Sequence, residues 1–310
     1  MVVQRWLGNP VLEPTQNWWE CRAVFNAGAV YHDGRVHLLY RALGDDYLSR
    51  LGYASSIDGF NFDVRSSTPV LESEPGDEFE RLGCEDPRVT RIDGKFYITY
   101  TAASVYPSSN PMPDGCTGAP WRVRVALAST DDFQTFHRHG VVIPDTDSKN
   151  AALFPERVNG KYLLLHRVFP NLWLCRSDDL LHWDAHSVLI EPRDGYWDSC
   201  KVGAGAPPIR TDMGWLEFYH GVSCEGIYGL GVLLLDLENP GKTLFRSNTP
   251  ILSPSKEFEK DGIVPNVVFT CGAVEIDGRY FVYYGGADKA IGVAVVDRDE
   301  LLGEIAKGIE

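Results

Sequence analysis

The sequence predicts an all-β protein that forms a single five-bladed β-propeller. Aromatic residues make up 12% of the 310 residues, and 30 glycines and 19 prolines accompany them, which is typical of many short strands joined by tight turns. A hairpin-like segment also recurs five times along the chain. No composition shift divides the chain, so residues 1–310 are expected to form one domain.

The recurring segment is a predicted β-hairpin. Most copies place an Asp-Gly or Asn-Gly pair between two apolar strands, which favours a type I′ turn because both turn residues need positive φ. The turn Asp or Asn stands at positions 33, 93, 159, 212 and 277, so the copies follow at intervals of 60, 66, 53 and 65 residues. The fourth copy, Asp212-Met213-Gly214, predicts a longer turn.

A third strand follows each hairpin in most copies, and a fourth closes the unit, so each copy predicts one propeller blade. The alternative is a β-sandwich with coincidental turns, but sandwich strands do not recur at so long a period. Two segments fall outside the repeat. Residues of about 105–122 are predicted to form an insertion in the second blade, and residues of about 297–308 a short C-terminal helix.

Charge and motif content exclude several functional classes. A net charge of −14 disfavours nucleic acid and anionic membranes as partners. No apolar run reaches the roughly 18 residues of a membrane span, and the N-terminus has no signal-like apolar region. Seven widely spaced cysteines without a C-x-x-C pair argue against a disulfide framework or a zinc site, which favours a cytoplasmic protein with reduced thiols. No cofactor or metal motif is found, and whether the chain is a homo-oligomer stays open.

Polar residues recur at equivalent places in successive predicted blades, where structure alone would accept small or apolar residues. The starts of first strands supply Asn26, Asp86, Lys149 and Lys201, and the ends of second strands supply Arg41, Arg167, His220 and Asp288. The basic members of this set, Lys149, Arg167, Lys201 and His220, contrast with the acidic chain and predict a local anion site. The alternative is that each cation pairs with a nearby acid.

Asp86 is the candidate catalytic carboxylate. Pro87 is expected to hold Asp86 in extended geometry at the mouth of the central channel. The alternative is a structural salt bridge between Asp86 and Arg88.

At these positions the chain resembles glycoside hydrolase family 130, the β-mannoside phosphorylases and their relatives. The matching motifs are Phe25–Ala29, Leu39–Ala42, Glu85–Arg88, Ala152–Glu156, Leu165–Arg167, Lys201–Pro208, Tyr219–Val222 and Pro265–Phe269. The resemblance covers nearly the whole chain. It implies a five-bladed propeller that cleaves a β-mannoside with inorganic phosphate as co-substrate, giving α-mannose 1-phosphate with inversion and needing no cofactor.

The resemblance also implies roles for individual residues. Asp86 would be the general acid, acting through the mannose 3-hydroxyl. Phosphate would be held by Asn150, Arg167, His220 and Tyr228, with charge added by Lys149 and Lys201, and the mannosyl ring by Asn26, Arg41 and Asp288. Phosphate is already an anionic nucleophile, so the second carboxylate of an inverting hydrolase is not required. A β-mannosidase of the same fold and a non-catalytic saccharide-binding propeller are the alternatives. The linkage cleaved, β-1,2 or β-1,4, and the acceptor sugar stay open.

Overall fold

A computed structural model describes residues 3–106 and 121–309 of the chain. The expected insertion at about 105–122 lies almost entirely outside the described residues. Nearly all of the regular secondary structure in the described chain is β-strand, as predicted, and the rest is two short helices, α1 (Glu257–Lys260) and α2 (Arg298–Lys307). Among the described residues, no helix has the length and apolar character needed to cross a membrane.

The first half of the chain forms one large sheet made of two meanders. Its strands are β2 (Ala23–His32), β3 (Arg35–Leu43), β4 (Ser49–Ser56) and β5 (Val64–Arg65), followed by β6 (Gly83–Ile92), β7 (Lys95–Val105), β8 (Trp121–Thr130) and β9 (Phe136–Ile143). Within each meander neighbouring strands pair antiparallel. The two meanders are joined by a single parallel pairing, between Ser49 and Gly83.

Three further sheets complete the fold. One contains β10 (Lys149–Leu153), β11 (Tyr162–Val168), β12 (Asn171–Ser177) and β13 (Trp183–Ile190). The next contains β14 (Lys201–Ala204), β15 (Ile209–Thr211), β16 (Gly214–Val222), β17 (Tyr228–Leu235) and β18 (Thr243–Arg246). The last contains β19 (Val268–Ile276), β20 (Arg279–Gly286), β21 (Ala290–Asp297) and β1 (Gln4–Arg5).

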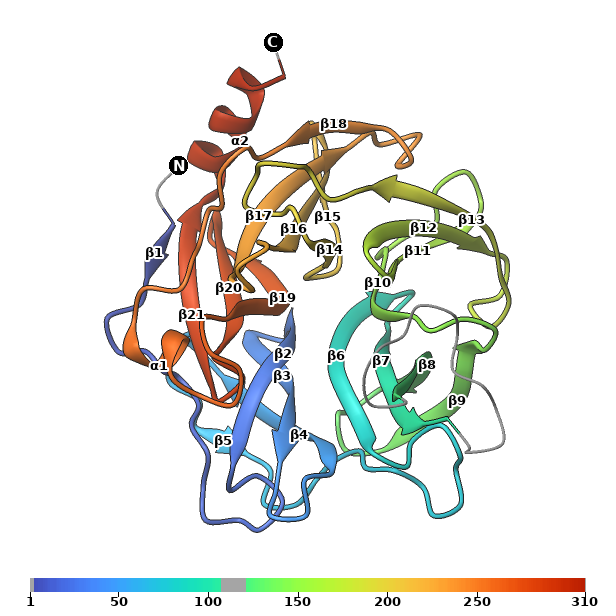
Figure 1. Cartoon of the computed structure of the whole chain (residues 1–310), viewed down its shortest axis with the longest axis vertical. Coiled ribbons are helices and arrows are strands. Elements are labelled where there is room, and N and C mark those ends of the chain that lie inside the picture. The colour runs from blue at the N-terminus through green and yellow to red at the C-terminus, as the bar shows by residue number, and fades with distance from the viewer. Residues whose placement is uncertain (1–2, 107–120, 310) are drawn as a thin grey trace.

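The sheets are arranged around a common centre in a β-propeller-like ring (Figure 1). Strands β2, β6, β10, β14 and β19, the first of each sheet or meander, lie nearest the middle. Strand β1 pairs antiparallel with β21, so the first and last strands of the chain belong to one sheet. Helix α2 follows β21 directly, with the Asp297 side chain accepting a hydrogen bond from the Glu300 N–H as its N-cap.

The predicted type I′ turns are confirmed in four copies. Positive φ occurs at both turn residues in the pairs Asp33-Gly34, Asp93-Gly94, Asn159-Gly160 and Asp277-Gly278. The prediction of a longer turn in the fourth copy is wrong. Thr211 pairs with Gly214, so only two residues connect β15 and β16. The Thr211 hydroxyl accepts from the Met213 N–H and donates to the Gly214 carbonyl, which closes a tight turn without an Asp-Gly pair.

A buried Tyr–carboxylate–Arg triad recurs in four of the units. The carboxylate precedes the innermost strand, the tyrosine lies on the second strand, and the arginine lies on the outermost strand. The four triads are Tyr40–Glu20–Arg65, Tyr100–Glu80–Arg138, Tyr219–Asp198–Arg246 and Tyr284–Glu259–Arg5. In each triad the tyrosine hydroxyl donates to the carboxylate, and the arginine forms an ion pair with it. Because every triad links the segment before a sheet to that sheet's outer strand, it holds the unit together.

Candidate active site

Backbone bulges place three of the predicted site residues. Asn26, Asp86 and Asn150 lie on the innermost strands β2, β6 and β10, with φ angles of 52°, 50° and 56°. The strand register shifts at each of these positions. The expectation that Pro87 holds Asp86 extended is therefore wrong, because the bulge requires a left-handed residue, which Asn and Asp tolerate best among non-glycine residues.

Most of the predicted residues line one pocket. Eight of the ten candidates do so: Asn26, Arg41, Asp86, Lys149, Asn150, Arg167, Tyr228 and Asp288. Val264, Val267 and Phe269 complete the wall. The lining comes from strands of all four sheets and from the connections before β19 and after β20, so residues that are far apart in the sequence meet here. The two other candidates, Lys201 and His220, do not line this pocket.

The Asp86 carboxylate lies in a buried hydrogen-bond network. Asn26 Nδ2 donates to Asp86 Oδ1 at 2.9 Å, and Arg41 Nη1 approaches the same oxygen at 3.3 Å. The other arm of Arg41 donates to Glu85 Oε1 at 2.6 Å. Burial opposes ionisation of Asp86, but the charges of Arg41 and Lys149 and the Asn26 hydrogen bond outweigh it, so the pKa of Asp86 lies below its usual range. With the pocket free of ligand, Asp86 is therefore a carboxylate.

Arg88 is not the partner of the Asp86 side chain, so the alternative of a structural salt bridge is wrong. Arg88 Nε donates to the Gly205 carbonyl at 2.7 Å, Nη2 to the Ala204 carbonyl at 2.8 Å, and Nη1 to the backbone carbonyl of Asp86 at 3.0 Å. All three bonds go to backbone oxygens. Arg88 thus ties β6 to β14 and its following residue, and it leaves the Asp86 carboxylate to the pocket.

Two cations at the pocket have no acidic partner. In residues 3–106 and 121–309, neither Lys149 nor Arg167 forms an ion pair, although Arg167 is only 9% exposed. Burial lowers the pKa of both side chains, and the neighbouring charge of Arg167 lowers that of Lys149 further. The alternative that each cation pairs with an acid is therefore wrong for these two. Buried positive charge without a partner favours an anion in the pocket.

His220 contributes no charge, which corrects its inclusion in the cationic set. The side chain is completely buried, and burial together with the charges of Arg167 and Arg88 lowers its pKa far below its usual value. The neutral ring lies with Nε2 3.1 Å from Asn150 Nδ2. His220 Nδ1 and Asn150 Oδ1 are buried without a hydrogen-bond partner in the described chain. The pair therefore keeps unused hydrogen-bonding capacity beside the pocket.

Gly203 makes room for this pair. A Cβ at Gly203 would lie 2.6 Å from His220 Cε1 and 2.8 Å from Asn150 Nδ2. Any side chain on this part of β14 would therefore displace the ring or the amide. Close packing around two site residues thus explains why one of the two glycines in the Lys201–Pro208 motif lies at this position.

The Tyr228 ring lies next to both Lys201 and His220. Lys201 Nζ lies 4.9 Å from the centre of the Tyr228 ring, and that ring is stacked on the His220 ring at 6.4 Å. Lys201 forms no ion pair within the described residues, and burial lowers its pKa. Tyr228 reaches the pocket, whereas Lys201 adds positive charge behind it.

Asp288 occupies a strained turn at the pocket. Asp288 and its neighbour Ala287, in the connection between β20 and β21, both have positive φ, of 52° and 46°. Non-glycine residues pay for such conformations with strain, which is often concentrated at functional sites. Burial raises the pKa of Asp288 to about 6, against the opposing charge of Arg41. A second carboxyl group of intermediate acidity thus shares the pocket with Asp86.

Sequence reasoning missed several residues of the site. Glu85 lies within the Glu85–Arg88 motif but was given no role, although it binds Arg41. Val264, Val267 and Phe269 lie in or next to the Pro265–Phe269 motif, and apolar residues there carried no chemical signal.

The family is decided by the match of nearly the whole chain to one family model. The model described as beta-1,4-mannooligosaccharide phosphorylase, glycoside hydrolase family 130, matches residues 10–307. The chain belongs to this family. The resemblance noted in the sequence is thus confirmed.

Members of family 130 with known names include similar sequences and structures. A "1,2-beta-oligomannan phosphorylase" of Thermoanaerobacter sp. (strain X514) is 42% identical over 307 residues, covering 96% of this chain and 98% of the relative. A solved "Beta-1,2-Mannobiose phosphorylase from Listeria innocua", in complex with beta-1,2-mannobiose, superposes with a TM-score of 0.85 at 29% identity, covering 99% of this chain and 100% of the other. A second structure has a TM-score of 0.84 at 27% identity, covering 95% of this chain and 93% of the other. It is described as showing glycoside hydrolases of the family that target beta-1,2 mannosidic linkages in Candida mannan.

Proposed function

We propose that this family 130 chain is an inverting phosphorylase that cleaves β-1,2-linked manno-oligosaccharides with inorganic phosphate. The products are α-mannose 1-phosphate and the shortened saccharide. The observation that carries the proposal is a pair of cations, the half-buried Lys149 and the buried Arg167, which line the pocket of Asp86 without an ion-pair partner in the described residues. The β-1,2 linkage is supported by the names of the Thermoanaerobacter and Listeria relatives.

Phosphate is proposed to bind between Lys149, Arg167 and the Asn150 amide, with Tyr228 at the edge. Charge-assisted hydrogen bonds from such donors are strong, and they fix the phosphate in line for attack. One phosphate oxygen forms the bond to the anomeric carbon while the bond from that carbon to the bridging oxygen breaks. His220 and Lys201 support this subsite, the first by orienting Asn150 and the second through charge behind Tyr228.

Asp86 is proposed to supply the proton that the departing oxygen needs, relayed through the mannose 3-hydroxyl. The free site holds Asp86 ionised, because Arg41 and Lys149 favour its charge. Phosphate brings negative charge next to Lys149, which weakens that attraction and raises the proton affinity of Asp86. Asp86 is thus protonated, and ready to act as the acid, when phosphate is bound. Asn26, Arg41 and Asp288 are proposed to hold the mannosyl ring.

A hydrolase is the second candidate function, because Asp288 is a second carboxyl group in the pocket. An inverting hydrolase uses one carboxyl group as acid and another to activate water. The second solved structure described above is reported with glycoside hydrolases of the same family, which target beta-1,2 mannosidic linkages in Candida mannan. Lys149 and Arg167 argue for phosphate instead, since activation of water does not require two cations without an acidic partner.

The decisive experiment compares sugar release with and without phosphate. The purified protein is incubated with β-1,2-mannobiose or β-1,4-mannobiose, and mannose and mannose 1-phosphate are quantified. We expect mannose 1-phosphate only from the β-1,2-linked substrate, and only with phosphate present. Equal release of mannose in phosphate-free buffer would reject phosphorolysis in favour of hydrolysis. No turnover under any condition, together with saccharide binding, would indicate a binding protein.

The number of blades, the extent of the catalytic unit and its cellular compartment are part of the same proposal. Five blades are supported by the single Ser49–Gly83 pairing between the two meanders of the largest sheet. We further propose that residues 1–310 act as one catalytic unit in the cytoplasm, with no cofactor besides the phosphate co-substrate and with no nucleic-acid or membrane partner.

A further inference from the structure

The third unit departs from the triad that the other four share. At the place of the tyrosine, β11 carries His166, and at the place of the outer-strand arginine, β13 carries His186. The position before the inner strand holds Ser148 in place of a carboxylate. Ser148 Oγ lies 2.8 Å from His166 Nδ1, and His166 Nε2 lies 3.0 Å from His186 Nδ1. The other four units fill this place with a Tyr–carboxylate–Arg triad, so the different set in the third unit calls for its own explanation.

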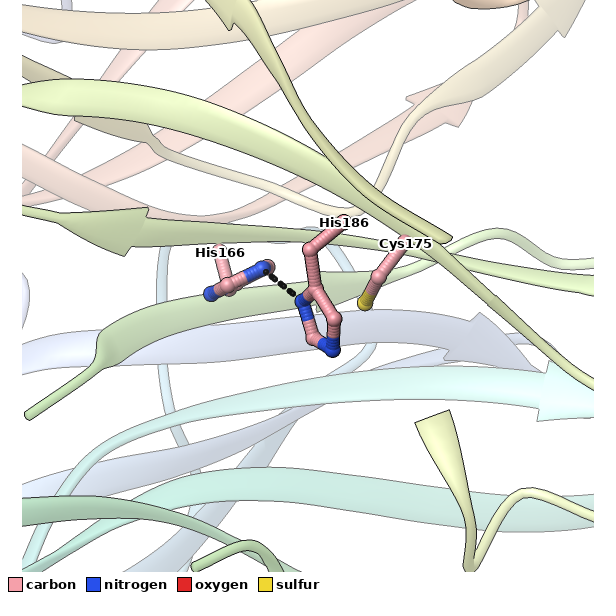
Figure 2. Close-up of side chains that lie close together, drawn as sticks. All are labelled: His166, Cys175 and His186. Atoms are coloured by element: carbon pink, nitrogen blue, oxygen red, sulfur yellow. Dashed lines mark hydrogen bonds between the residues drawn. The ribbon is translucent and has the colours of Figure 1, made fainter. Parts of the chain in front are cut away.

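A cysteine completes the cluster. Cys175 on β12 is fully buried, and its sulfur lies together with one nitrogen of His166 and one of His186, all within 4.8 Å of one another. Figure 2 shows the three side chains converging, with the two rings joined by their hydrogen bond. In the described part of the chain, this is the one group of three or more such side chains with ligand atoms this close.

Strand register and a bulge produce this convergence. Leu164 pairs with Cys175 and His166 with Trp173, so His166 and Cys175 lie on the same face of neighbouring strands. The register of β12 with β13 shifts opposite Cys175, and Ala185 has a φ of 51°. The bulge therefore turns His186 toward this face, as bulges do where a side chain must be re-aimed.

We propose that His166, Cys175 and His186 form a binding site for a transition-metal ion, Zn²⁺ foremost. Two imidazoles and one thiolate match the borderline-soft ligand preference of zinc. Tetrahedral zinc with Zn–N of about 2.0 Å and Zn–S of about 2.3 Å puts its ligand atoms roughly 3.3–3.6 Å apart. His166 Nε2 and His186 Nδ1 are 3.0 Å apart, and the Cys175 sulfur lies within 4.8 Å of a nitrogen of each ring, which is close to that spacing. A water molecule would fill the fourth position.

The surrounding hydrogen bonds suit the two imidazoles to ligation. His186 Nε2 lies 3.3 Å from the Trp183 carbonyl, so it donates there and leaves the lone pair of Nδ1 toward the cluster. The His166 proton can move from Nε2 to Nδ1, where Ser148 Oγ accepts it.

When Zn²⁺ binds, the one proton released to solvent comes from the Cys175 thiol. Zinc replaces the thiol proton, forming a Zn–S bond and releasing one H⁺ to solvent, which makes binding stronger as pH rises. His186 is exposed and β13 is the outermost strand of its sheet, so an ion can enter from solvent.

Cobalt titration tests the site, because Co²⁺ is coloured in tetrahedral thiolate sites. The full-length protein, dialysed against a chelator, is titrated with Co²⁺ and followed by absorption. We expect a thiolate-to-cobalt charge-transfer band that saturates at one equivalent and that Zn²⁺ abolishes. The exposed thiol variant Cys200→Ser keeps the band and serves as the matched control.

Two variants keep the test decisive. Cys175→Ser removes the thiolate, and His186→Gln changes only an exposed side chain, so it preserves folding. Both are expected to lose the band and to weaken Zn²⁺ binding more than the roughly 10–100-fold caused by changes outside the ligand set. Zn²⁺ should also raise the Tm of the unaltered protein but not of the variants. An unaltered protein without the band, or a Cys175→Ser protein with an equal band, would overturn the proposal.

Discussion

Replacing Arg167 by methionine separates the function of this cation from its effect on stability. The guanidinium is nearly buried and has no acidic partner within the described chain, so it costs folding free energy in the ligand-free protein. Methionine is of similar length, uncharged and flexible enough to fill the space. The Arg167→Met variant should therefore be more stable than the unaltered protein when phosphate is absent. A gain of about 0.5–2 kcal/mol, typical of stabilising changes at functional sites, corresponds to a Tm increase of roughly 1–4 °C.

Phosphate binding should change in the opposite direction. A hydrogen bond to a charged group contributes about 1.5–3 kcal/mol, and each 1.4 kcal/mol is tenfold in affinity. The KM for phosphate should therefore rise about 10- to 150-fold in Arg167→Met. At 100 times its Kd, phosphate stabilises the unaltered protein by about 2.7 kcal/mol, and the variant should lose most of this at the same concentration.

The assay measures initial rates of mannose 1-phosphate formation at varied phosphate, with thermal unfolding measured with and without phosphate. Arg210→Met is the matched control, because Arg210 is exposed and pairs with Glu156 on the surface. It should leave both quantities nearly unchanged. A phosphate KM within twofold of the original in Arg167→Met, or a loss of stability in phosphate-free buffer, would refute the reasoning.

Three further predictions concern other residues of the pocket. Asp86→Asn should lower kcat for phosphorolysis about 10²–10⁴-fold while circular dichroism shows an unchanged fold, and near-normal turnover would exclude Asp86 as the acid. Asp288→Asn should remove a pH-dependent loss of stability. The pKa of Asp288 is about 6 in the folded protein, above that of an unfolded Asp, so protonation of Asp288 stabilises the folded state. This contribution to the free energy of unfolding is complete below about pH 4 and is lost as pH rises through 6. Chemical denaturation of both proteins between pH 4 and 7 checks this, and parallel curves would contradict it. Gly203→Ala should destabilise the protein by about 1–3 kcal/mol and raise the KM for phosphate, because the new methyl group would clash with His220.

The repeating hairpins could be predicted because their signal is local. An Asp-Gly or Asn-Gly pair determines its own turn, and the structure shows positive φ at both residues in four of the five copies. The fourth turn failed as a prediction because Thr211 supplies side-chain hydrogen bonds that the dipeptide rule does not include. Eight of the ten candidate residues were found from their equivalent places in successive units, and six of these eight line the pocket. Asn150 and Tyr228 were identified only through the family resemblance.

The remaining features depend on register, which no short motif encodes. The bulges that place Asn26 and Asp86 are visible only as a shift in pairing between two strands. The charge state of His220 depends on the cations around it and on its complete burial. The cluster of His166, Cys175 and His186 has no zinc-binding spacing in the sequence, and strand pairing alone brings it together.

The pairing of β1 with β21 has a consequence for how the molecule is made. Arg5 completes the last triad by reaching Glu259, and Gln4 pairs with Val295. During synthesis these first residues leave the ribosome long before their partners exist. The final sheet therefore cannot close until residues 290–297 have emerged, so closure of this sheet follows the synthesis of the earlier meanders.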